Sequence, residues 1–166
     1  KVRPPLEVYQ NGLAEFDAAR NTFVKVAEFP KSAPLFPSGH TLLHREDGVE
    51  YIYFCHPYPL VRVRAVPELL ADLSAYEAYT CLKAGCRLDD PQLDRVAEGR
   101  LRYAWKSQTP VVGPVEQNKL VAAKKLRADE GLLQLADRET GRAVLAHHGS
   151  VNWNAYRKKW VMITVE

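Results

Sequence analysis

A row of short polar side chains near the end of the sequence has the spacing of one strand face. In "SVNWN" (150–154), strand alternation places Ser150, Asn152 and Asn154 on one face and Trp153 on the other. Sugar hydroxyls need both hydrogen-bond donors and acceptors, and an amide supplies both. The three residues are therefore candidates for carbohydrate binding, and hydrogen bonding to nearby turn backbones is the alternative. We expect Trp153 in the core, with stacking on a sugar ring as the alternative.

Histidines accompany this row. His40 follows a Ser-Gly pair at the start of a predicted strand, and His148 precedes the polar row. Both are candidates for the same binding cavity, although a hydrogen-bonded structural role is the alternative for His40. His147 and His148 are adjacent, so on a strand they point to opposite faces and only one can face a given ion. We therefore expect no metal site and no cofactor.

Whether a glycan bound in such a cavity could be cleaved depends on which carboxylate side chains line it. Glycoside hydrolysis uses two of them, one protonated as the acid and one ionised as base or nucleophile. The predicted strands 38–44 and 147–154 contain neither Asp nor Glu. Glu77 is the candidate catalytic residue, because it lies within a predicted strand, whereas Asp137 precedes a turn and is expected to be solvated. The carboxylate pair is thus incomplete in this chain, and the sequence leaves hydrolysis open.

Three segments of the chain have the pattern of β-hairpins. Each has a short strand, a polar turn and a second strand rich in aromatic and β-branched residues: 13–29, 38–56 and 149–165. The Asp47-Gly48 pair between two apolar runs is a strong hairpin signal. The second strands 51–54 and 160–163 are apolar on both faces, so we expect them to be covered on both sides. Since a single hairpin is barely stable alone, the three should pack together.

The strand order of residues 38–82 suits a propeller blade. In "PLVRVRAV" (59–66), Arg62 and Arg64 share one face, which predicts an outer strand with a wet side. The strands within 38–66 are then the inner, middle and outer strands of a blade. A fourth strand, "YEAYTCL" (76–82), completes the blade, so that four strands run outward from an axis. A short helix is predicted at 67–73 and a longer one at 115–128. Strands are also predicted within 100–106 and 132–149.

The hairpin "SVNWNAYRKKWVMI" (150–163) resembles the blade-opening motif of five-bladed β-propellers related to glycoside hydrolases. "PSGHTLLHREDGVEYIYF" (37–54) and 76–82 are similar to the preceding blade of bacterial proteins of this kind. The resemblance covers about 37–82 and 132–166. It implies a mainly β fold: residues 1–166 would be a fragment of one β-propeller domain, about two to three blades, with a partly helical insertion at about 83–131.

The resemblance also implies a function. The protein would bind a glycan in the axial funnel, where the inner strands meet, and catalytic relatives hydrolyse it with carboxylates placed on different blades. The alternative is a noncatalytic propeller that binds a glycan or a protein. The remaining blades of the parent chain would be its partners, and a bacterial periplasmic or extracellular setting is expected. Because the chain begins with Lys1 rather than Met, a missing signal segment carries no conclusion.

Composition excludes several other classes. With 46% hydrophobic and 26% charged residues the chain is of ordinary globular composition, and a net charge of +3 does not indicate nucleic-acid binding. No apolar run reaches the roughly 18 residues of a membrane helix. Three cysteines, Cys55, Cys81 and Cys86, fit no zinc spacing and are expected to be buried thiols, although a small disulfide loop between the last two stays open.

Overall fold

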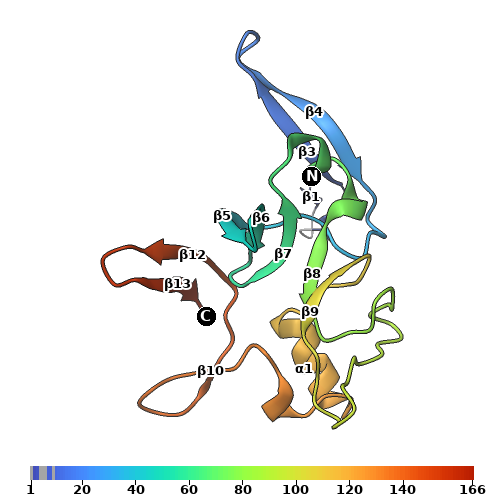
Figure 1. The fold of residues 1–166 in the computed structure, drawn as a ribbon, viewed down its shortest axis with the longest axis vertical. Helices are drawn as coiled ribbons and strands as arrows, with labels where there is room; N and C mark the ends of the chain where they lie inside the picture. Colours follow the sequence, from blue (N-terminus) through green and yellow to red (C-terminus); the bar gives the residue numbers. More distant parts are fainter. Residues whose placement is uncertain (1, 4–6, 9) are drawn as a thin grey trace.

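The computed structural model describes residues 2–3, 7–8 and 10–166, and their secondary structure is mainly antiparallel β (Figure 1). The strands are β1 (Val2–Arg3), β2 (Glu7–Val8), β3 (Asn11–Asp17), β4 (Thr22–Phe29), β5 (His40–Glu46), β6 (Val49–Cys55), β7 (Pro59–Arg64), β8 (Glu77–Thr80), β9 (Ala104–Ser107), β10 (Leu135–Ala136), β11 (Ala143–Val144), β12 (His148–Asn154) and β13 (Lys159–Val165). A single α-helix, α1 (Pro114–Ala122), is present in the described residues, with short 3-10 turns at Pro67–Leu69, Leu73–Ala75 and Ala128–Glu130.

The central element is a five-stranded antiparallel sheet in which β5 to β9 follow one another in sequence order. Asp47 and Gly48 join β5 to β6, and both have positive φ (50° and 80°), as a two-residue type I′ turn requires. The hairpin predicted at this turn is confirmed, with His40 to Glu46 paired to Cys55 to Val49 in reverse order. Pairing then continues through β7 and β8 to the edge strand β9.

One face of this sheet forms the main hydrophobic core. Alternation along β7 and β8 directs Val61, Val63 and Ala78 to this face, where they pack with Leu35 and Tyr76. The partly buried side chains that cover them come from β6, from the 3-10 turns after β7 and, with Val111, from the loop after β9. The helix predicted at 67–73 is therefore two 3-10 turns, which supply apolar side chains to the core.

A second core lies under α1. Cys81, Leu82, Val112, Leu120 and Leu126 are buried together there. α1 is shorter than the predicted helix at 115–128, because the chain leaves helical geometry after Ala122 and continues to a 3-10 turn. All three cysteines are free thiols, and the half-buried Cys86 contacts this core.

The segment predicted as an insertion is tied to the sheet. After β8 the chain forms a long loop and returns as β9, the fifth strand of the sheet. Buried Asp94 accepts a hydrogen bond from Lys106 Nζ at 2.7 Å and one from Arg102 Nε at 3.0 Å, so an ion pair links the loop to β9. Residues 83–131 therefore both extend the sheet and cover its end with α1 (Figure 1).

The other two predicted hairpins are also confirmed: β3 pairs with β4, and β12 with β13. In Figure 1, β3–β4 extends from the central sheet at the top, and β12–β13 lies at the left, with β12 in contact with β5. The expectation that residues 160–163 are covered on both sides is wrong, because Ile163 is 67% exposed. Trp153 is likewise outside the core, at 52% exposure, and its ring meets Trp160 edge-on.

The prediction that 59–66 is an outer strand is wrong as well. β7 is the middle strand of the five, between β6 and β8, and Arg62 is buried. Its charge is accommodated by two carboxylates, Glu77 on the adjacent strand β8 and Glu46 on β5, rather than by water. Every sheet formed by the described residues is open, and the arrangement of blades around an axis stays a prediction.

Candidate functional site

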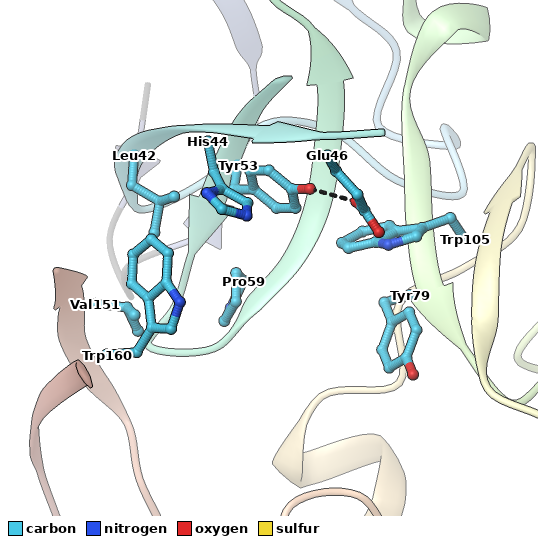
Figure 2. A pocket seen from close by; sticks show the side chains of 9 residues that line it. All are labelled: Leu42, His44, Glu46, Tyr53, Pro59, Tyr79, Trp105, Val151 and Trp160. Carbon is cyan, nitrogen blue, oxygen red and sulfur yellow. Dashed lines mark hydrogen bonds between the residues drawn. The ribbon is translucent and has the colours of Figure 1, made fainter. Parts of the chain in front are cut away.

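A cavity of about 520 Å³ lies between the face of the central sheet opposite its core and the β12–β13 hairpin. Figure 2 shows Trp160 on one side of it and Trp105 with Tyr79 on the other. Side chains of β5 and β6 lie between these two walls. The lining residues are Leu42, His44, Glu46, Tyr53, Pro59, Tyr79, Trp105, Val151 and Trp160.

Strand alternation explains why these side chains meet. Along β5, positions 42, 44 and 46 point to the same side, so Leu42, His44 and Glu46 form a row above the cavity. The next strands add to this row in register: Tyr53 lies opposite Leu42, and Tyr79 lies opposite Trp105. With Pro59 at the start of β7, the chain thus brings residues from all five strands of one sheet to a single surface.

An ion network fixes the polar part of this surface. Arg62 Nε donates a hydrogen bond to Glu77 Oε2 at 2.8 Å, and Arg62 Nη1 donates one to Glu46 Oε2. Tyr53 Oη donates to the same Glu46 oxygen at 2.7 Å. Burial, followed by the hydrogen bond to Glu46, raises the pKa of Tyr53, so its hydroxyl remains a donor at neutral pH.

Aromatic rings hold the guanidinium in place. Arg62 Cζ lies 4.1 Å from the ring centre of Tyr51 and 4.4 Å from that of Trp105. Cation–π contacts of this kind stabilise a desolvated guanidinium. Burial, the largest single influence, would lower the pKa of Arg62, but the hydrogen bonds to Glu77 and Tyr53 and the charges of neighbouring groups together outweigh it, so the pKa is raised. Arg62 is therefore a permanent cation that orients both Glu46 and Trp105.

The opposite wall is supplied by the β12–β13 hairpin. Val151 and Trp160 lie on the same hairpin face, because Trp160 pairs with Trp153, two residues along from Val151. The Trp160 ring meets His44 edge-on, with ring centres 5.3 Å apart at an interplanar angle of 88°. This contact joins the hairpin to β5 and closes one side of the cavity.

The predicted polar row lies on the other face of β12. Ser150, Asn152 and Asn154 alternate with Val151, so they point away from the cavity wall. Asn154 Oδ1 accepts a hydrogen bond from the backbone N–H of Arg157 at 2.8 Å, which is the turn-stabilising role given as the alternative. Asn152 Nδ2 donates to Ser150 Oγ at 3.4 Å. Trp153 borders the cavity through its contact with Trp160 but does not line it.

Among the predicted histidines, His148 is brought close to a histidine that the sequence had not singled out. Its ring centre is 4.8 Å from that of His56, just beyond β6. Burial, followed by the charges of His148 and His40, lowers the pKa of His56. These three histidines do not line the cavity, and no group of three His, Cys, Asp or Glu able to hold a metal ion occurs among the described residues.

The predicted carboxylate Glu77 lies beside the cavity, bound to Arg62. Asp137 caps the turn between β10 and β11, where its carboxylate accepts hydrogen bonds from the Glu139 and Thr140 backbones. The residues that sequence reasoning missed are Glu46, Tyr53, Tyr79, Trp105 and Trp160. The alternating row Leu42, His44 and Glu46 was the available signal, because it predicts one shared face.

Comparison with protein-family models, with characterised proteins and with solved structures finds no match for the chain. Within the described residues, no helix has the length and apolar character needed to cross a membrane. The functional argument therefore rests on the geometry of the cavity.

Proposed function

We propose that this protein binds a carbohydrate in the cavity between the central sheet and the β12–β13 hairpin. The observation that carries the proposal is the placement of Trp160 opposite Trp105 and Tyr79, with the Glu46 carboxylate between the two aromatic walls (Figure 2). Aromatic rings offer apolar surfaces to the C–H face of a sugar ring, while carboxylate and phenol groups take its hydroxyls.

The size of the cavity supports a ligand of this kind. Its volume of about 520 Å³ lies within the range of roughly 300–1,000 Å³ that is usual for small-molecule sites. Such sites combine a mostly apolar lining with a few placed polar groups, and here these groups are His44, Glu46 and Tyr53. All three are held by neighbouring residues: His44 against Trp160, and Glu46 and Tyr53 by their shared hydrogen bond.

The propeller that the resemblance implies belongs to this proposal. In that arrangement β5 to β8 would form one four-stranded blade, and β12–β13 would open the next. Contacts between β12 and β5 support it, because those would be the inner strands of successive blades. The cavity would then open towards the axial funnel, with the remaining blades of a longer chain around it.

Binding without hydrolysis is the function that the geometry favours. The two carboxylates on this surface, Glu46 and Glu77, are both paired with Arg62. An ion pair with arginine uses the ionised carboxylate, whereas glycoside cleavage needs one carboxyl group that keeps its proton. Glu77 is accordingly proposed as a residue that positions Arg62 rather than as a catalytic acid.

Calorimetric titration with a panel of neutral oligosaccharides tests the proposal. We expect at least one oligosaccharide to bind, and Trp160→Ala to weaken that binding roughly tenfold, since truncating a central aromatic anchor costs more than about 1 kcal/mol. Trp153→Ala is the matched control, because Trp153 is on the same hairpin but outside the lining. Absence of binding to every oligosaccharide, neutral or charged, or equal losses in the two variants, would overturn the proposal.

A further inference from the structure

The charge of the cavity narrows the class of sugar that it would accept. Its lining contains one carboxylate, Glu46, and neither lysine nor arginine. Arg62, beside the cavity, is paired with the carboxylates of Glu46 and Glu77, so the three groups together carry a formal charge of −1. The cavity is therefore electronegative, although the chain as a whole carries a net charge of +3.

Arg62 cannot offer its charge to a ligand. Its side chain is only 10% exposed, its Nε and Nη1 groups donate to Glu77 and Glu46, and its plane is flanked by Tyr51 and Trp105. A ligand carboxylate in the cavity would meet Glu46 with no free lysine or arginine in the lining to balance it. The site thus disfavours uronic acids and other anionic sugars.

Glu46, in contrast, keeps one oxygen for a ligand. Both hydrogen bonds to its carboxylate, from Tyr53 and Arg62, go to Oε2, and within the described part of the chain Oε1 accepts none. Its side chain is 43% exposed. Figure 2 shows the carboxylate pointing towards Trp105 at the cavity wall.

The aromatic walls of the cavity also favour a positively charged ligand. The faces of tyrosine and tryptophan rings are electronegative and attract ammonium groups as well as apolar C–H surfaces. Tyr79, Trp105 and Trp160 line the cavity on both sides of the Glu46 carboxylate. A carboxylate oxygen next to such rings is the combination that binds a positively charged amine.

We propose that the cavity binds amino sugars, with the protonated amine placed between Glu46 Oε1 and the rings of Trp105 and Tyr79. This inference rests on the proposed carbohydrate binding and specifies its ligand class. It assigns a specificity role to Glu46, and it assigns Arg62 the role of presenting that carboxylate.

Three oligosaccharides of equal length test the inference by titration at about pH 6, where a sugar amine carries its proton. They are a glucosamine oligomer, its fully N-acetylated counterpart and a galacturonate oligomer. We expect the glucosamine oligomer to bind roughly tenfold more tightly than the acetylated one, from one ion pair and one cation–π contact. The galacturonate oligomer should bind most weakly.

Two variants separate the role of Glu46 from general loss of the ion network. Glu46→Gln and Glu77→Gln each remove one partner of Arg62, but only Glu46 lines the cavity. Glu46→Gln should abolish the tenfold preference, because it weakens binding of the glucosamine oligomer more than binding of the acetylated one. Glu77→Gln should retain the preference.

The outcomes distinguish this inference from the function on which it rests. Equal binding of the glucosamine and acetylated oligomers, tightest binding of galacturonate, or loss of preference in Glu77→Gln alone would overturn the amino-sugar inference while carbohydrate binding stands. If none of the three oligomers binds and the neutral panel also fails, both proposals are wrong.

Discussion

Arg62 and Glu77 lie directly opposite each other on β7 and β8, and their side chains form an ion pair with an N–O distance of 2.8 Å. The pair is on the face of the sheet that carries the cavity, next to the rings of Tyr51 and Trp105. A charged residue in the middle of the sheet thus supports the cavity on its surface. The Arg62 guanidinium links β7 to β8 and also orients Glu46.

Replacement of Arg62 should destabilise the protein and leave two carboxylates without their partner. We expect Arg62→Met to lower the free energy of unfolding by about 2–3 kcal/mol, towards the low end for broken buried ion pairs because both glutamates are partly exposed. Arg62→Lys should also destabilise, since an ammonium cannot reproduce the fork that reaches both carboxylates. Urea denaturation measures both values, and an Arg62→Met variant as stable as the parent would contradict this role.

The Tyr53 hydroxyl should have a measurable stabilising effect that the Tyr79 hydroxyl lacks. Tyr53→Phe removes a donor to Glu46 from a nearly buried ring and should cost about 1 kcal/mol of unfolding free energy. Tyr79→Phe is the control, because in the described residues the Tyr79 hydroxyl makes no hydrogen bond and lines the open cavity. Equal effects of the two substitutions would show that the bond to Glu46 contributes nothing.

The burial of His56, with the charge of His148 beside it, predicts a loss of stability on mild acidification. The pKa of His56 is lowered in the folded protein, so between that value and the usual pKa of about 6.5 the unfolded chain binds more protons. Stability should therefore be fully present above about pH 7 and decrease, seen as a lower melting temperature, as the pH falls towards 5. Carboxylates such as Glu130, whose pKa is lowered to about 2 chiefly by Arg95, lose their contribution only at lower pH.

A pair of neighbouring variants tests this assignment. His148→Gln removes the second cause of the lowered pKa of His56 and should reduce the melting-temperature difference between pH 7.5 and pH 5.5. His147→Gln changes the adjacent residue, which does not contribute to the lowered pKa of His56, and should keep the difference. A parent protein that melts at the same temperature at both pH values would rule out the mechanism.

Local patterns in the sequence predicted the strands well. The Asp47-Gly48 pair, the runs on each side of it and the two other hairpins all depend on near neighbours, so turn chemistry and alternation were sufficient. The same alternation predicted a polar surface at 59–66, but it could not specify that this surface is buried. Arg62 is separated by 15 and 16 residues from its two carboxylate partners, and only the pairing of strands brings them together.

The cavity was beyond prediction for a related reason. Ser150, Asn152 and Asn154 share one strand face, as alternation predicted, but which face meets the sheet depends on how the hairpin packs. Because Trp160 packs against His44, the apolar face of the β12–β13 hairpin is turned towards the sheet. The cavity wall is therefore made by Val151 and Trp160. Glu77 was singled out as a spare carboxylate in a strand; its proximity to Glu46 through Arg62 depends on contacts between distant strands.

The most direct test of the proposed site is a two-dimensional NMR titration that follows the indole N–H signals of the three tryptophans with the tightest-binding oligosaccharide. Assignment uses single Trp→Phe variants at positions 105, 153 and 160. The proposed cavity predicts that the signals of Trp105 and Trp160 shift together with one dissociation constant, and that the Trp153 signal shifts least. Movement of Trp153 alone, with Trp105 and Trp160 unchanged at saturation, would contradict a binding site between the sheet and the hairpin.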